Sequence, residues 1–204
     1  MNETTKDRDW PGYYRKTGDR PPRPTLVFAL DRFDAEDPNA LPSQAVDLGC
    51  GGGRDAIEML RRGWRVFAVD AEAAALDALR AREDLPDDAE LDGLVARFED
   101  AAWPSCDLVN SSFALPLCPP DGFARTWDHI RASLRLGGRF AGHLFGEHDS
   151  WAGRDGMTFH TRRQAEELLD GLEVEYFDEE EDYSTTVRGE AKHWHVFHIV
   201  ARKV

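Results

Sequence analysis

The sequence predicts an α/β protein in which a mostly parallel, doubly wound sheet is covered by helices on both faces. Apolar runs at 45–50, 64–70 and 106–115 have the composition of buried parallel strands, and helix-favouring stretches separate them. A cluster of glycines follows the first run, where such sheets bind their ligands. Late runs at 173–182 and 192–203, with no long helix between them, predict an antiparallel pair on one sheet edge.

The N-terminal part is expected to be an irregular arm followed by one helix. Residues 1–24 are polar and contain four prolines, a composition typical of irregular structure. We expect Thr25 to cap a short helix that continues to Phe33, and residues 34–42 to form a loop.

Strands and helices then alternate, which gives seven predicted strands in all. Glycines are expected to end two of the helices, at Gly63 and at Gly137 with Gly138, and Thr161 is expected to cap the last helix. In chain order we expect a strand at 45–50, a helix at 54–62, a strand at 64–70, a helix at 71–83, strands at 94–98 and 106–115, a helix at 122–134, a strand at 139–146, a helix at 160–172, and strands at 173–182 and 192–203.

Length and composition favour a single domain. A chain of 204 residues is close to the ~150 residues of an average domain, and 41% hydrophobic residues are enough for a core. Within this domain, residues 1–42 would cover the ligand site and residues 43–146 would bind the ligand. Residues 147–204 would supply a substrate loop, a helix and the strand pair.

The charge balance excludes several classes of function. The chain has 25 basic and 39 acidic side chains, and its formal net charge of −14 disfavours nucleic-acid and membrane partners. No run reaches the ~20 apolar residues of a transmembrane helix, and the N-terminus lacks the apolar centre of a signal peptide. Cys50, Cys106 and Cys118 have no CxxC spacing, which argues against disulfides and zinc and favours a cytoplasmic location.

The most informative segment is V-D-L-G-C-G-G-G-R at 46–54, where a strand enters a glycine turn before a helix. Asp70 ends the next strand, 70 − 47 = 23 residues after Asp47, where an acid can accept hydrogen bonds from both hydroxyls of a ribose. A dinucleotide fingerprint is not excluded, because its third glycine would fall on Arg54 or on the tolerated Ala56. Asp47 beside the turn favours a cationic amino group over a pyrophosphate.

These residues resemble those of the class I S-adenosylmethionine-dependent methyltransferases. D-L-G-C-G-G-G-R (47–54) is similar to their first motif and F-A-V-D (67–70) to their second, and N-S-S-F-A-L-P (110–116) and L-R-L-G-G-R-F (134–140) are similar to later segments. The resemblance covers 43–146 and implies a Rossmann-like fold with S-adenosylmethionine as cofactor and S-adenosylhomocysteine as product. The cofactor-binding residues that it implies are Asp47, Gly49, Gly51, Gly53, Asp70, Ala71, Phe98, Glu99, Asp100 and Asn110.

A narrower resemblance is to the small bacterial methyltransferases of the tellurite-resistance type. It depends on the Y-Y pair at 13–14, on D-L-G-C-G-G-G-R-D-A (47–56) and on the compact length. We expect His148 and Tyr14 to be catalytic, although Tyr14 could equally belong to a packed arm and His148 to a solvated loop. The expected substrate-binding residues are Tyr13, Tyr14, Phe113, Phe145, His148, Trp151, His160, His193 and His195.

The late histidines also allow a metal hypothesis. His193 and His195 would share one face of a strand and His198 the other. Only His160 offers itself as a third ligand, so we expect no metal.

The expected reaction is an in-line transfer of a methyl group to a small molecule. A base is needed only where the acceptor is protonated, as a phenol is, and not for a thiolate or another chalcogen anion. The acceptor could be a thiol, a selenol, a chalcogen anion, a phenol or an amine, and the protein a monomer or a homodimer. The alternatives are a nicotinamide-dependent oxidoreductase and a catalytically inactive cofactor-binding member of the fold.

Overall fold

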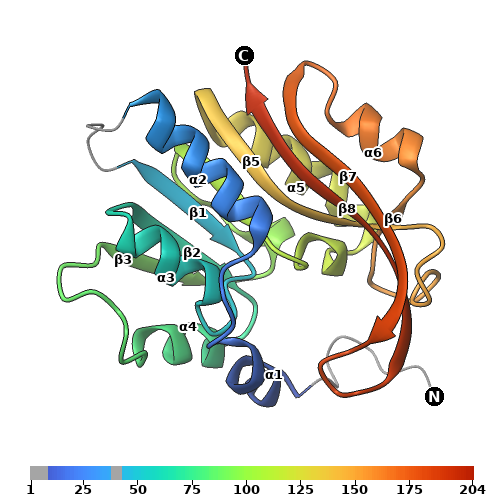
Figure 1. The fold of residues 1–204 in the computed structure, drawn as a ribbon, viewed down its shortest axis with the longest axis horizontal. Coiled ribbons are helices and arrows are strands. Elements are labelled where there is room, and N and C mark those ends of the chain that lie inside the picture. Colours follow the sequence, from blue (N-terminus) through green and yellow to red (C-terminus); the bar gives the residue numbers. More distant parts are fainter. Residues whose placement is uncertain (1–8, 38–42) are drawn as a thin grey trace.

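The computed structural model describes residues 9–37 and 43–204. They form one sheet in the order β3-β2-β1-β4-β5-β8-β7, with the short strand β6 paired to β5 (Figure 1). The strands are β1 (Gln44–Leu48), β2 (Arg65–Asp70), β3 (Leu91–Val95), β4 (Cys106–Ser111), β5 (Leu134–Gly146), β6 (Phe159–His160), β7 (Leu172–Thr185) and β8 (Ala191–Lys203). The helices are α1 (Trp10–Thr17), α2 (Pro24–Glu36), α3 (Arg54–Arg61), α4 (Ala73–Arg80), α5 (Pro120–Ser133) and α6 (Arg162–Leu168).

The predicted fold class is confirmed. Strands β1 to β5 pair in parallel, and β8 runs antiparallel to both β5 and β7. The predicted seven-stranded sheet gains an eighth strand, because Phe145 and Gly146 of β5 pair with β6. A two-residue strand is too short to leave a periodic signal in a sequence.

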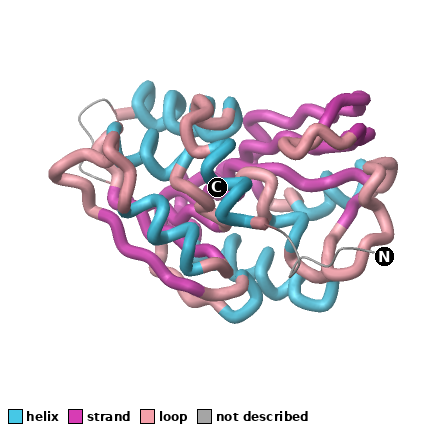
Figure 2. The backbone as a smooth tube through the Cα atoms, turned by 90° about the horizontal axis from the view of Figure 1, so that it is seen from below, coloured by secondary structure: helices cyan, strands magenta, loops and turns pink. Residues whose placement is uncertain are grey.

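Both faces of the sheet are buried, as continuous apolar strands require. On one face, Val46 and Val109 pack with Trp127 of α5. On the other, Leu108 packs with Leu30 of α2 and with helices α3 and α4. Figure 2 shows the helices on both sides of the strands. The carboxyl ends of β1, β2, β4 and β5 therefore meet along one edge, where helix α1 lies against the turn that follows β1.

The predicted irregular arm is wrong over residues 10–17, whereas residues 18–23 are irregular as predicted. Residues Trp10–Thr17 form helix α1, because the side chain of Asp9 accepts a hydrogen bond from the amide of Gly12 (2.9 Å) and caps the first turn. Residues 1–8 of the predicted arm lie outside the described part of the chain.

Helix α2 also begins and ends differently from the expectation. It starts at Pro24 with Arg23 as the N-cap residue, so Thr25 does not cap it. Proline suits the first helical position because its φ is already helical and its missing N–H has no partner there. The helix continues to Glu36 into the predicted loop, and residues 38–42 of that loop are not described.

Other boundaries move by a few residues. Strand β3 ends at Val95 and not at 98. Strand β5 begins at Leu134 and includes Gly137 and Gly138, so helix α5 ends at Ser133, before these glycines. The predicted cap at Thr161 is confirmed, with Gln164 completing a capping box. No helix among residues 9–37 and 43–204 is both long and apolar enough to cross a bilayer.

Candidate active site

The glycine turn after β1 is built so tightly that side chains do not fit. Gly49 and Gly53 have φ of 79° and 83°, which L-residues rarely adopt. A Cβ atom at Gly49 would clash with the Cβ of Ala114, and one at Gly53 with the side chain of Leu79. The turn therefore presents bare backbone at this edge of the sheet.

Asp70 connects this turn to the N-terminal helix. Its carboxylate accepts hydrogen bonds from the amides of Gly51 and Glu72 (both 3.0 Å) and from the Tyr14 hydroxyl (3.4 Å). Burial raises the pKa of Asp70, while these three hydrogen bonds oppose that rise. Burial and the neighbouring Asp70 raise the pKa of Tyr14, so its hydroxyl stays a donor and does not act as a base.

Asp47 lies beneath the turn in a buried network. The Asn110 amide donates to Asp47 Oδ1 (2.8 Å) and to Asp55 Oδ2 (3.2 Å). Burial raises the pKa of Asp47 to about 8, and the charge of Asp55 adds to the rise. Asp47 Oδ2 has no hydrogen-bond partner among the described residues. An oxygen in this position suits a ligand that donates a hydrogen bond, such as a cationic amino group.

A cavity of about 180 Å³ opens beside the glycine turn, and we call it the turn cavity. Six of the predicted cofactor-binding residues line it, and four do not. Asp47 and Asn110 lie in the buried network, Gly53 caps α3, and Asp100 is exposed. The six that line it are Gly49, Gly51, Asp70, Ala71, Phe98 and Glu99.

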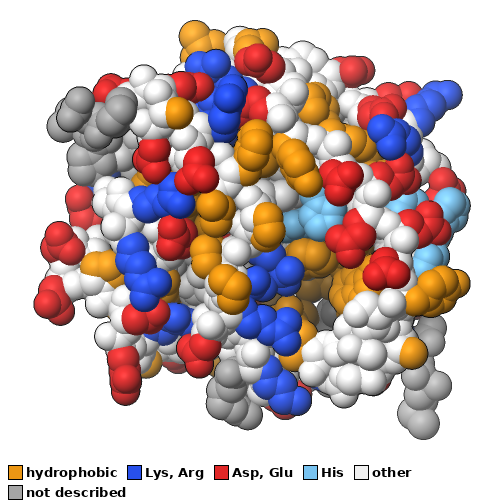
Figure 3. All heavy atoms as spheres, viewed as in Figure 1, with side chains coloured by type: hydrophobic (Ala, Val, Ile, Leu, Met, Phe, Trp, Pro, Cys, Tyr) orange, Lys and Arg blue, Asp and Glu red, His pale blue; other side chains and the backbone are white. Residues whose placement is uncertain are grey.

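A second cavity of about 630 Å³ adjoins the first, and we call it the aromatic cavity. Figure 3 shows a hollow on this face, with basic side chains on one side and acidic side chains on the other. The two cavities share four wall residues, Trp10, Tyr13, Phe113 and Leu117. The remaining aromatic walls are Phe145, Trp151 and Trp194. Tyr13, Phe113, Phe145 and Trp151 were predicted to contact substrate, and Trp194 was missed.

The ring of Phe113 covers a buried imidazole in the wall of the aromatic cavity. Phe113 is the non-glycine residue with a positive φ (58°) in the described chain, and its ring stacks on His143 with centroids 4.2 Å apart. His143 is 1% exposed, and neither of its ring nitrogens has a partner among the described residues. Burial holds the pKa of His143 well below its usual range, so the imidazole is neutral.

The structure places His148 outside both cavities, so the expectation that it contacts substrate has no geometric support. Its ring is exposed, and Nδ1 lies 3.5 Å from Glu181 Oε2. His143, which lines the aromatic cavity, was not among the residues predicted from the sequence. The strand alternation that places His143 beside Phe145 on one face of β5 was the available signal.

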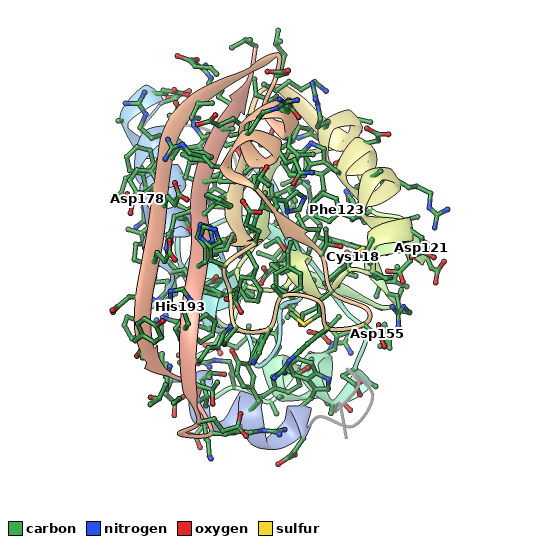
Figure 4. The ribbon with its side chains drawn as sticks, turned by 90° about the vertical axis from the view of Figure 1, so that its right-hand side faces the viewer. Cys118, Asp121, Phe123, Asp155, Asp178 and His193 are labelled. Carbon is green, nitrogen blue, oxygen red and sulfur yellow. The ribbon has the colours of Figure 1, made fainter. Side chains whose placement is uncertain are left out.

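The other predicted histidines also lie outside both cavities. His193 and His195 face away from His198 on β8, as predicted, and His195 Nε2 lies 2.8 Å from Glu179. His160 packs on Phe123 with ring centroids 4.7 Å apart, and burial lowers its pKa to about 4. Figure 4 shows His193 on the β7–β8 hairpin, well separated from Phe123.

Three side chains come close enough to hold an ion, in a grouping that the sequence did not suggest. Ligand atoms of His148, Glu181 and His195 lie within 4.8 Å of one another. Both nitrogens of His195 are already used, since Nδ1 accepts from the His148 amide (3.1 Å) and Nε2 contacts Glu179. The cluster therefore has a structural explanation without a metal.

The strand order, the glycine turn and the acid at the end of β2 define a class I S-adenosylmethionine-dependent methyltransferase domain. Residues 45–138 match the family model described as a methyltransferase domain, so the resemblance found in the sequence is confirmed. S-adenosylmethionine and S-adenosylhomocysteine are bound in two solved structures that share this fold. No curated protein sequence matches the chain significantly.

Solved structures share the fold at low sequence identity. TehB from Haemophilus influenzae is 16% identical with a TM-score of 0.69, and the match covers 85% of this chain but only 62% of TehB. A TehB-like methyltransferase from Corynebacterium glutamicum is 18% identical with a TM-score of 0.60 over 96% and 94% of the two chains. Magnesium protoporphyrin IX methyltransferase from Synechocystis, with bound S-adenosylmethionine, is 14% identical with a TM-score of 0.65 over 94% and 89%.

Proposed function

We propose that this chain transfers a methyl group from S-adenosylmethionine to a small-molecule acceptor by in-line displacement. The observation that carries the proposal is the shared wall between the turn cavity and the aromatic cavity, made of Trp10, Tyr13, Phe113 and Leu117. A cofactor beside the glycine turn would thus adjoin an acceptor on the other side. Juxtaposition of two reactants is the main requirement of this reaction.

The residues of the turn cavity suit the cofactor. Asp70 would accept from the ribose hydroxyls. Asp47 lies in the buried network beneath the turn, and its unpartnered Oδ2 would take up the ammonium group of the methionine part. Gly49 and Gly51 line the cavity with backbone alone. When bound, S-adenosylmethionine supplies an activated methyl group on a sulfonium.

The aromatic cavity would orient the acceptor and exclude water. The aromatic cavity has a volume of about 630 Å³, compared with about 180 Å³ for the turn cavity. A cavity of this size suits a small organic molecule better than a polymer. A thiol, selenol, chalcogen anion, phenol or amine is compatible with such a reaction. Tyr14 contributes by holding Asp70, and His148 has no place in this scheme because it lines neither cavity.

Calorimetric titration tests the proposal. We expect micromolar binding of S-adenosylmethionine and S-adenosylhomocysteine and no binding of NADH, the ligand of the oxidoreductase alternative. Asp70→Ala should weaken the binding of S-adenosylhomocysteine at least about tenfold, because charge-assisted hydrogen bonds to the ribose contribute ~1.5–3 kcal/mol to binding. Asp77→Ala, an exposed acid on α4, is the matched control and should change nothing. A folded protein that does not bind S-adenosylhomocysteine would contradict the proposal.

A further inference from the structure

We propose that the acceptor is an aromatic acid, whose carboxylate is held by Arg23 and Arg154 between the rings of the aromatic cavity. The inference rests on the proposed function and names the substrate class of the same site. Arg20, Arg23 and Arg154 line this cavity without an ionic partner among the described residues, and Arg23 and Arg154 are the two of them that are half-buried.

Arg23 and Arg154 each lie over an aromatic wall residue. The guanidinium carbon of Arg23 is 4.2 Å from the centroid of Phe113, and that of Arg154 is 4.9 Å from Trp151. Neither side chain has an ion pair or a hydrogen bond to any other described residue. In a chain with 39 acidic and 25 basic side chains, two unpaired arginines in one cavity are unexpected.

A third arginine shows how this protein otherwise treats buried guanidinium groups. Arg139 is fully buried and is paired with both Glu36 and Glu175. Pairing of this kind offsets the loss of hydration. Arg23 is half-buried but has no such carboxylate partner, and burial lowers the pKa of its guanidinium. An anionic ligand would supply the missing partner.

The surrounding walls indicate the rest of the ligand. Phe113, Phe145, Trp151 and Trp194 offer ring faces and edges to a planar molecule. A guanidinium fork matches a carboxylate with two parallel hydrogen bonds. Three acids also line the cavity, Asp9, Glu180 and Glu190, and none of them is paired with Arg23 or Arg154. Glu180 is instead hydrogen-bonded to His198 (2.8 Å). A flat aromatic ring with a carboxylate satisfies both parts of the cavity.

Binding measurements without turnover test this substrate class. The protein with saturating S-adenosylhomocysteine is titrated with the hydroxybenzoate isomers and with the corresponding uncharged hydroxybenzamides, and tryptophan fluorescence is followed. We expect at least one carboxylate to bind about tenfold or more tightly than its amide, corresponding to ~1.4 kcal/mol. Arg23→Gln and Arg154→Gln should each abolish this preference.

Arg125→Gln, an exposed arginine on α5, is the control and should keep the preference. Equal binding of acids and amides, or a preference that survives both variants, would overturn the inference. Unchanged affinity for S-adenosylhomocysteine in these variants shows that the cofactor site, and with it the proposed function, is intact. Benzyl phosphate serves as a further probe, and a preference for it over every benzoate would also overturn the carboxylate assignment.

A separate observation concerns the proton of the acceptor. We infer that His143 accepts a proton from the nucleophilic group, which makes that group a hydroxyl and not a chalcogen anion. His143 lines the aromatic cavity, and both of its ring nitrogens are buried without a partner among the described residues. Buried polar atoms without partners are uncommon in folded proteins. An acceptor hydroxyl would donate to one of these nitrogens.

The chemistry of the step balances without another reactant. As the acceptor oxygen bonds to the methyl carbon, the O–H bond breaks and its proton passes to the neutral imidazole. The carbon–sulfur bond breaks, and its electron pair remains on sulfur. The products are a methyl ether, a neutral thioether and an imidazolium, which returns its proton to water after product release.

The ring of Phe113 controls access to His143. It covers the imidazole at 4.2 Å, so an acceptor reaches a ring nitrogen only when the phenyl ring shifts. Its φ of 58° is a strained conformation for a residue with a side chain, and such strain is common at ligand sites. The charged and titratable groups around His143 are His198, which is paired with Glu180, and the guanidinium groups of Arg23 and Arg54.

Acceptor binding provides a readout that does not depend on turnover. With S-adenosylhomocysteine present, the hydroxybenzoate that binds best should bind His143→Gln within about threefold of the wild-type affinity, because glutamine still accepts a hydrogen bond but takes up no proton. The variant should also lose about 100-fold or more in kcat/KM with this acceptor, as is usual when a general base is removed. With a nitro-substituted hydroxybenzoate, already ionised at neutral pH, the loss should be below about threefold.

His129→Gln removes a histidine that stacks on Trp103 away from both cavities and should behave as wild type in each assay. Equal losses with both acceptors, or an unchanged kcat/KM for the hydroxybenzoate in His143→Gln, would overturn the role of His143. Binding of the acids in His143→Gln shows that the variant is folded, so the result does not depend on activity alone.

Discussion

The two cavities of this protein are built in opposite ways. The glycine turn and Asp70, which lie within 49–70, form the centre of the turn cavity, and segments 10–14, 97–99 and 112–117 complete its walls. The aromatic cavity is assembled from distant parts of the chain, including Arg23 on the N-terminal side, Phe113 after β4, Trp151 after β5 and Trp194 on β8. The contiguous region carries the part of the reaction that a whole family shares. The dispersed region carries the part that selects an acceptor.

This contrast predicts how each region responds to substitution. A contiguous turn fails through local backbone geometry, so a single added atom is enough to disturb it. A cavity made of dispersed segments is disturbed when a substitution removes the packing or the ion pairs that hold those segments together. Three substitutions separate these two modes of failure.

Gly49→Ala should have the largest effect on cofactor binding. A Cβ atom would meet that of Ala114 in a turn whose φ is 79°, so clash and strain act together. We expect a loss of stability of about 2–4 kcal/mol and at least about a tenfold weaker affinity for S-adenosylhomocysteine, measured by thermal unfolding and calorimetry.

Gly63→Ala is the matched control for this change. Gly63 has nearly the same φ, 78°, but a Cβ atom there would meet nothing within 4 Å. It should therefore lose only about 1 kcal/mol from strain and bind S-adenosylhomocysteine normally. Equal losses in the two variants would show that the close packing at Gly49 is unimportant.

The difference between the two regions also explains how much the sequence could predict. The motif around Asp47 and Asp70 specifies a strand, a turn and a second strand over a short distance, so local patterns were enough to place both. The parallel order of the sheet followed from the same alternation of strands and helices. Boundaries shifted where tertiary contacts decide, as at Asp9, whose side chain caps α1, a helix in a segment that composition describes as irregular.

The aromatic cavity was predicted only in part. Phe113 and Trp151 follow strands whose carboxyl ends meet at one edge of the sheet, so topology alone brings them near the cofactor. The position of Arg23 depends on how helix α2 lies against β5, which no local pattern encodes, whereas His143 could have been found from the strand alternation of β5. His148 has a suitable residue type and sequence position, but its side chain points to Glu181 instead.

Lys192→Met should affect the aromatic cavity while sparing the turn cavity. Lys192 is buried in an ion pair with Asp149, and its ammonium lies 3.9 Å from the ring of Trp151 and 4.2 Å from Trp194. Removing one partner of a buried pair leaves the other charge unpaired, which costs about 3–5 kcal/mol. Chemical denaturation should show this loss, and fluorescence should show weaker hydroxybenzoate binding at unchanged S-adenosylhomocysteine affinity.

The double variant Lys192→Met with Asp149→Leu removes both charges and should recover most of the lost stability. Arg163→Ala breaks an exposed pair with Glu167 and should cost at most about 0.5 kcal/mol. If the single and double variants were equally unstable, packing around the lysine and not its charge would hold Trp151 and Trp194.

Substitution of Asp47 should have the smallest effect of the three, and that effect concerns a single proton. Burial raises the pKa of Asp47 from 3.8 to about 8, so near neutral pH the carboxyl is largely protonated in the ligand-free protein. Because the folded-state pKa is raised, its contribution to stability is full below pH ~3.8 and is lost as the pH rises through about 8. An ammonium group at Oδ2 would favour the carboxylate and drive out the proton.

Binding of S-adenosylhomocysteine at pH 7 should therefore release up to about one proton per site, as linkage between a ligand and a shifted pKa requires. Calorimetry in two buffers with different ionisation enthalpies measures this release directly. Asp47→Asn should abolish it and also flatten the fall in stability between about pH 4 and pH 8, whereas Asp77→Asn should leave both unchanged. Proton release that persists in Asp47→Asn would assign the ammonium to another acid, and Asp70, with its own raised pKa, would then be the group to substitute next.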